Sequence, residues 1–170
     1  DGLEKFNGTT WTHFDNTNSG LPENDIRVLK ADSSGNLWMC YYGGMGSSLN
    51  GLTKFDGTNW TIYDTTNSGI LSNYIADIQI DKQNNIWLSC KGGISKFDGT
   101  TFTNYLHPGW GGYLALEDSA NIWEGLFGLD HFNPITGVWT HEDQSNSSIP
   151  SDNVSCIEID TNGVIWLGFS

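Results

Sequence analysis

The sequence predicts an all-β protein, and three observations support this prediction. Glycine accounts for 21 of the 170 residues, which supplies many turns. Aromatic residues reach 13% and include eight tryptophans, whereas charged residues are only 16%, and this balance favours strands over helices. One pattern of short strands and turns also recurs along the chain. A chain of this length folds as one domain that buries about 68–70% of its unfolded surface.

The first repeated segment combines Gly, Leu or Ile, any residue, Lys and Phe with a polar turn and an aromatic residue. It occurs at 2–12, 51–61 and 93–103, with a degenerate copy at 128–140. Its Asn-Gly or Asp-Gly pairs at 7–8, 56–57 and 98–99 predict tight hairpin turns, because glycine readily adopts positive φ.

The second repeated segment is an Asp, a short polar turn, an aliphatic residue and a Trp. Its four copies span 32–38, 81–87, 118–123 and 160–166, so its tryptophans recur every 36 to 49 residues. Joined to the first segment, it predicts units of four antiparallel strands, placed in the second unit at 75–80, 86–90, 94–97 and 102–105. Such a sheet cannot cover both of its faces alone, so the units are expected to stack radially as the blades of a β-propeller.

We expect a single domain over 1–170 with blades at about 24–72, 73–109 and 110–151, and a fourth made of 152–170 plus 1–23. The chain starts at the third strand of a unit and ends at the second. Pairing these terminal strands would remove two exposed sheet edges and close a four-bladed ring. Two alternatives remain open, namely an eight-bladed ring shared by two chains and an excerpt from a longer propeller.

Charge and hydropathy exclude several partners. Seven Lys and Arg against twenty Asp and Glu give a net charge of −13. This charge disfavours nucleic acid and anionic lipid, which require cationic side chains. No apolar run approaches the roughly 18 residues of a membrane span, so we expect no membrane insertion.

The cysteines and histidines do not form a recognisable chemical motif. The three cysteines, at positions 40, 90 and 156, lie beside apolar residues and are expected to be buried free thiols. The four histidines, at 13, 107, 131 and 141, lack metal-ligand spacing. We therefore expect no catalytic residues, metal or cofactor. An acid and base pair of His107 with Glu124 or Asp118 has no support from spacing.

The residues that recur in every unit are interpreted as structural. The turn carboxylates are expected to accept backbone N–H groups, with a metal ring as the alternative; they are Asp32, Asp81, Asp118 and Asp160. The repeated tryptophans are expected to pack between blades; they are Trp38, Trp87, Trp123 and Trp166. A ligand site should instead use residues that break the repeat.

Three segments break the repeat, at 41–50, 105–113 and 124–128. Loops between second and third strands and links between blades emerge on the same face of a propeller, so these breaks are expected to meet there. Exposed aromatic rings beside polar groups are typical of sugar-binding surfaces. The candidate ligand-binding residues are Tyr41, Tyr42, His107, Trp110 and Tyr113; the alternative for Trp110 is that it fills a gap in the core.

The repeated segments resemble the two-component regulator propeller repeat, which combines an Asp-x-x-Gly-x-Ile-Trp segment with Gly-Leu-x-x-Phe-Asp-Gly. Asn-Ser-Gly-Leu-Pro at 18–22 also fits the link between blades in that family. The resemblance implies an extracytoplasmic sensing part of a bacterial hybrid two-component system, or a secreted or surface protein. It further implies recognition of polysaccharide fragments. This chain contains no kinase, receiver or DNA-binding segment.

The sequence therefore predicts a noncatalytic propeller that binds a carbohydrate or a protein surface. We expect an extracellular, cell-surface or periplasmic location, with a homodimer or a larger parent assembly as further partners. The alternatives are an assembly or scaffold module, a fragment of a larger sensor propeller, and a propeller lyase or hydrolase that uses a His and an acid.

Overall fold

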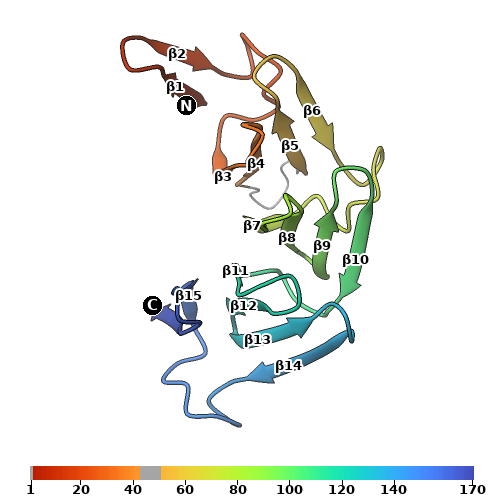
Figure 1. The fold of residues 1–170 in the computed structure, drawn as a ribbon, viewed down its shortest axis with the longest axis vertical. Coiled ribbons are helices and arrows are strands. Elements are labelled where there is room, and N and C mark those ends of the chain that lie inside the picture. Colours follow the sequence, from red (N-terminus) through yellow and green to blue (C-terminus); the bar gives the residue numbers. More distant parts are fainter. Residues whose placement is uncertain (1, 43–50) are drawn as a thin grey trace.

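The computed structural model describes residues 2–42 and 51–170, in which every regular element is a β-strand (Figure 1). All strand pairs are antiparallel and join neighbours in sequence. The prediction of an all-β propeller fold with four-stranded antiparallel blades is confirmed. No helix among the described residues has the length and apolar character needed to cross a membrane.

Three complete sheets follow one another along the chain. The first contains β3 (Ile26–Ala31), β4 (Leu37–Tyr41), β5 (Leu52–Phe55) and β6 (Trp60–Tyr63). The second contains β7 (Ile75–Ile80), β8 (Ile86–Cys90), β9 (Gly93–Phe97) and β10 (Phe102–Leu106). The third contains β11 (Tyr113–Leu116), β12 (Ile122–Leu126), β13 (Gly128–Asn133) and β14 (Val138–Glu142). These strands lie within the ranges 24–72, 73–109 and 110–151.

Two half-sheets complete the fold, and they do not form the predicted fourth blade. Among the described residues, β1 (Leu3–Phe6) pairs with β2 (Trp11–Phe14), and β15 (Val154–Ile159) pairs with β16 (Ile165–Phe169), as separate two-stranded sheets. Each half-sheet packs on its sequence neighbour, and the rotation from sheet to sheet leaves the two half-sheets at opposite ends of an arc (Figure 1). The expectation that both termini complete one blade is therefore wrong for this structure.

Apolar packing between successive sheets forms the core. The first strands pack in series, with β3 against β7, β7 against β11 and β11 against β15. Trp38 of the first sheet lies edge-on to Phe97 of the second, with ring centroids 5.8 Å apart. Trp87 of the second sheet clusters with Leu114 and Phe132 of the third. The predicted role between blades is confirmed for Trp38 and Trp87, and Trp123 packs partly buried against the next sheet, but the prediction is wrong for Trp166, which is exposed.

The repeated Asp residues cap their turns as predicted. One oxygen of Asp81 accepts the N–H groups of Gln83 and Asn85, each at 2.9 Å. The other oxygen accepts the indole N–H of Trp87 at 3.0 Å, a bond that the sequence reading missed. The same indole bond joins Asp32 to Trp38 and Asp160 to Trp166.

The third sheet departs from this arrangement. The separation of Asp118 from Trp123 is one residue shorter than in the other copies. Asp118 still accepts the side-chain amide of Asn121, as Asp81 accepts that of Asn85. The indole bond is lost, because among the described residues the buried indole nitrogen of Trp123 has no hydrogen-bond partner. His131 stacks on Trp123 at 4.2 Å, where the other complete sheets place a lysine over the equivalent tryptophan.

The cysteine prediction holds at two positions and is wrong at the third. Cys40 and Cys90 are buried, and burial raises the pKa of Cys40 to about 12. Cys156 is exposed. It occupies the strand position that Asp77 occupies in β7, where the following sheet covers that residue. No further sheet among the described residues covers β15, so the Cys156 thiol stays in solvent.

Because the arc is open, equivalent tryptophans contribute unequally to the free energy of unfolding. Trp87 is 1% exposed and Trp166 is 62% exposed. We expect Trp87→Ala to lower the free energy of unfolding by about 3–5 kcal/mol, because it leaves a cavity between two sheets. Trp166→Ala should lower it by less than about 1 kcal/mol. Urea denaturation of both variants checks this, and an equal loss at the two sites would mean that Trp166 is buried in a closed blade in solution.

Candidate ligand surface

The five candidate residues divide by exposure. Tyr42, directly after β4, is 56% exposed, and Trp110, in the link between β10 and β11, is 57% exposed. Tyr113 at the start of β11 is also exposed, and His107 is half-buried. The remainder of the first predicted break, 43–50, lies outside the described residues.

Tyr41 is the exception because its side chain is buried. It clusters with Leu3, Leu21, Met39 and Phe55, and this burial raises the pKa of its phenol. Among the described residues, its hydroxyl has no hydrogen-bond partner. The prediction that Tyr41 binds the ligand is therefore wrong, because its ring belongs to the core between the β1–β2 half-sheet and the first sheet.

Tyr42 and Trp110 belong to one continuous row of aromatic and cationic side chains. The guanidinium of Arg27 lies 5.7 Å from the ring centroid of Tyr42 and 5.9 Å from that of Tyr74. The ring of Tyr74 meets Trp110 edge-on, with centroids 6.3 Å apart. The ammonium of Lys91 lies 4.1 Å from the Trp110 centroid. We call Tyr42, Arg27, Tyr74, Trp110 and Lys91 the aromatic row.

The backbone explains why these residues share one face. Tyr42 follows the second strand of its sheet, and its N–H donates to Asp25, which precedes the first strand, at 2.9 Å. Lys91 and Tyr74 form the equivalent bond in the next sheet at 3.1 Å. These positions lie at the end of the strands opposite the Asp turns. The predicted meeting of the first two breaks is therefore found for Tyr42 and Trp110, through Arg27 and Tyr74, which the sequence reading missed.

A hollow adjoins the row at Trp110 and has a volume of about 190 Å³. His107 lines it and stacks on Trp139 at 4.2 Å, while Tyr113 lies opposite Gly125 in the sheet and belongs to neither the row nor the hollow lining. Two acids, Glu124 and Asp130, and a second histidine, His141, complete its polar lining. The hollow joins the second break to the third, since Glu124, Leu126 and Phe127 also line it.

The link that carries Trp110 is held by a buried carboxylate. Glu124 accepts the N–H of Gly112 at 2.9 Å and the hydroxyl of Ser89, and burial raises the pKa of Glu124 above its ordinary value. Gly111 has φ +76°, and a Cβ there would approach the Ser89 oxygen to 2.7 Å. Only glycine suits this position. The pair Gly111-Gly112 was the sequence signal for this close approach.

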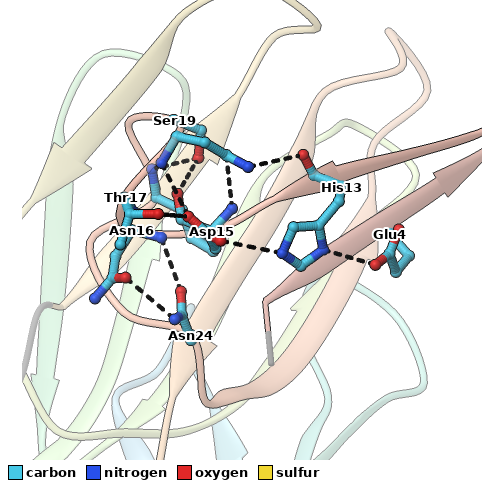
Figure 2. Close-up of polar contacts among 9 residues, drawn as sticks. Glu4, His13, Asp15, Asn16, Thr17, Ser19 and Asn24 are labelled. Carbon is cyan, nitrogen blue, oxygen red and sulfur yellow. Dashed lines mark hydrogen bonds and ion pairs between the residues drawn. The ribbon is translucent and has the colours of Figure 1, made fainter.

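The other links between sheets follow one common design instead. Asp15 accepts the N–H and hydroxyl of Thr17 at 2.7 and 2.6 Å, and Asn24 accepts the N–H of Asn16 (Figure 2). The same turn recurs at Asp64 and at Asp143. The link that bears Trp110 is thus the one of four in which the common turn is replaced, as the broken repeat predicted.

A histidine between two carboxylates occurs twice. The two ring nitrogens of His141 lie 2.8 Å from Asp130 and 3.4 Å from Asp143. His13 lies likewise 2.6 Å from Glu4 and 3.1 Å from Asp15 (Figure 2). In each case the hydrogen bond to the cross-strand acid raises the histidine pKa. The His13 arrangement lies away from the hollow and therefore does not depend on it. In both copies the histidine joins the outer strand of a sheet to the turn that follows that strand.

Across residues 2–42 and 51–170, no three His, Cys, Asp or Glu side chains are placed to hold a metal ion. The turn carboxylates are occupied by backbone and indole N–H groups, as described above. The polar chemistry of this face consists of hydrogen bonding, ion pairing and contact with aromatic rings.

The fold and these repeated turns define the chain as a β-propeller segment. Residues 148–170 match the two component regulator propeller family, which confirms the resemblance to that repeat. A comparison with curated proteins finds no match.

Solved structures share the propeller fold. The extracellular domain of BT3049 from B. thetaiotaomicron, assigned to a hybrid two-component system, is 23% identical with a TM-score of 0.75, over 93% of this chain and 22% of that one. PorZ, a surface component of the type-IX secretion system of Porphyromonas gingivalis, is 15% identical with a TM-score of 0.68, over 95% and 27%. This chain thus spans about a quarter of the length of these proteins.

The environment of His141 predicts how it titrates. We expect its pKa, measured by NMR, to lie above 6.5 and to fall toward that value in Asp130→Asn, which removes the nearer carboxylate. Asp143→Asn should lower the pKa less, because that carboxylate is farther away. Since the folded pKa is raised, the stabilisation from His141 is complete below pH 6.5 and is lost as the pH rises through the folded pKa. A pKa unchanged by Asp130→Asn would contradict this account.

Proposed function

We propose that this propeller recognises a ligand without catalysing a reaction, and that the ligand is a carbohydrate bound along the aromatic row. The observation that carries the proposal is the continuity of the row. Tyr42 and Trp110 come from different repeat units, and both are more than half exposed. Tyr74 and Arg27 join them into one surface.

The chemistry of the row suits sugars. The apolar C–H faces of a sugar ring pack on exposed aromatic rings, while its hydroxyls need nearby donors and acceptors. The hydroxyl of Tyr74 accepts from Arg27 at 3.3 Å, and the acids and histidines of the adjoining hollow supply further polar groups. His107 belongs to this proposed site through the hollow, whereas Tyr113 is exposed but contacts neither the row nor the hollow, so we leave it out of the proposed site.

The solved structures support a place outside the cytoplasm. BT3049 and BT4673 contribute extracellular domains of regulatory systems, and PorZ is a surface component. We infer an extracellular, cell-surface or periplasmic location for this chain from that likeness.

The histidine and acid residues in the hollow do not favour catalysis. Both ring nitrogens of His141 face carboxylates, so neither is free to take a proton from a substrate. The same arrangement recurs at His13 outside the hollow. His107 lies 4.0 Å from Asp130, which is beyond hydrogen-bond distance.

An assembly module is the second candidate, and the half-sheets favour it. Phe6 and Trp166 are more than half exposed there, although their equivalents in the second sheet, Phe97 and Trp87, are buried. Trp11 is also more than half exposed, whereas its equivalent Phe102 is half-buried. A homodimer or a larger parent assembly would cover these side chains. Light scattering behind a sizing column separates the candidates, since a monomer has 18.8 kDa and a stable dimer has twice that mass.

The carbohydrate proposal predicts a specific loss in one variant. Trp110→Ala should weaken binding to the glycans that a glycan array identifies by about tenfold or more, because an exposed aromatic ring that packs on the ligand contributes about 2 kcal/mol. Trp11→Ala is the matched control, since Trp11 is an exposed tryptophan of the β1–β2 half-sheet. Calorimetry with the identified glycan measures both, and equal affinities in wild type and Trp110→Ala would rule out the row as the site.

A further inference from the structure

We propose that the ligand is a short acidic oligosaccharide, whose one or two carboxylates bind Arg27 and Lys91 while its sugar rings lie on Tyr42, Tyr74 and Trp110. This inference rests on the proposed function and specifies its ligand class. The geometry that points to it is the alternation of cationic and aromatic groups along the row.

The two cations of the row have no carboxylate partner within the described residues. The ion pairs there all involve His13, His107 or His141, although the chain has twenty acids and only seven Lys and Arg. None of the seven Lys and Arg side chains forms an ion pair with an acid among the described residues, and what distinguishes Arg27 and Lys91 is that they lie against the rings of the row. A ligand on these rings would therefore meet two cations that no acidic side chain neutralises.

Arg27 is half-buried and keeps N–H donors beyond the one that it gives to Tyr74. The rings of Tyr42 and Tyr74 lie 5.7 and 5.9 Å from its guanidinium, and one of its nitrogens donates to the Tyr74 hydroxyl at 3.3 Å. These contacts hold the side chain in one orientation before the ligand arrives. The planar guanidinium retains further N–H donors, and two of them match the two oxygens of a carboxylate.

Lys91 provides a second positive charge at the other end of the row. It is exposed, its ammonium lies 4.1 Å from the Trp110 centroid, and its N–H is fixed to the carbonyl of Tyr74. Arg27 and Lys91 are thus separated by Tyr74 and Trp110. This spacing places charged groups beside two stacking surfaces, which suits successive sugar units better than a single small anion.

The overall charge limits the ligand to few negative charges. The field of a protein with net charge −13 repels a dense polyanion, and the hollow beyond Trp110 adds Glu124 and Asp130. A ligand with one or two carboxylates meets mainly the local field of Arg27 and Lys91, because charges beyond about 8 Å are screened at physiological salt. An acidic peptide lacks the flat apolar faces that the three rings require.

The test uses a panel of uronate-containing oligosaccharides of two to four sugars, each with its carboxyl-reduced neutral counterpart. Calorimetry on the purified chain should show binding of at least one uronate that is about tenfold tighter than that of its neutral counterpart. Arg27→Gln and Lys91→Met should each weaken uronate binding about fivefold or more, and by a larger factor than they weaken binding of the neutral counterpart. Lys82→Met is the matched control, because this substitution removes the same charge from an exposed lysine in an Asp turn at the opposite end of the strands.

The possible failures are distinguishable. Neutral glycans that bind as tightly as uronates, with loss in Trp110→Ala, would overturn the acidic ligand and leave the proposed function standing. No binding by any glycan would overturn both. Equal binding of a tri-glutamate peptide, or tighter binding of heparin, would overturn the short acidic sugar. Urea midpoints of Arg27→Gln and Lys91→Met within the error of wild type show that a loss of affinity is not a loss of folding.

Discussion

Every sheet of this protein has two faces to cover, and the apolar layer between successive sheets is what covers them. Trp38, Ile78 and Phe97 form one such layer, and Trp87, Leu114 and Phe132 form the next. Because each layer needs side chains from two sheets, no sheet is stable in isolation. The half-sheets at the ends of the arc show the consequence, since Trp166 and Cys156 there remain in solvent.

The same constraint explains where the fold tolerates change. The Asp turns, the inter-sheet tryptophans and the Asp15-type links recur because each serves the contact between sheets. The third sheet keeps its tryptophan but has a shorter turn before Trp123, has His131 in place of a lysine against that ring, and follows the Gly111-Gly112 link. Its contact to the second sheet is restored by buried carboxylates, as Asp77 accepts the N–H of Leu114 at 2.8 Å and Glu124 accepts that of Gly112.

These departures connect packing to the candidate surface. Glu124 and Ser89 hold the glycine link close to the second sheet, and that position turns Trp110 outward toward Tyr74. Arg27 lies against the rings of Tyr42 and Tyr74, and it forms no ion pair with an acid among the described residues. A substitution that loosens the buried Glu124 contact is therefore expected to disturb ligand binding as well as stability, although Glu124 itself is buried.

The sequence by itself determined the strands, their turns and their division into repeat units, because alternation and the glycine turns act between residues that are close along the chain. It also located Tyr42 and Trp110 as breaks in the repeat. Only the tertiary structure decided that Tyr41 is buried, that Arg27, Tyr74 and Lys91 belong to the row, and that the two half-sheets stay apart. These features depend on the rotation between neighbouring sheets and on contacts between distant residues, and no local pattern encodes either.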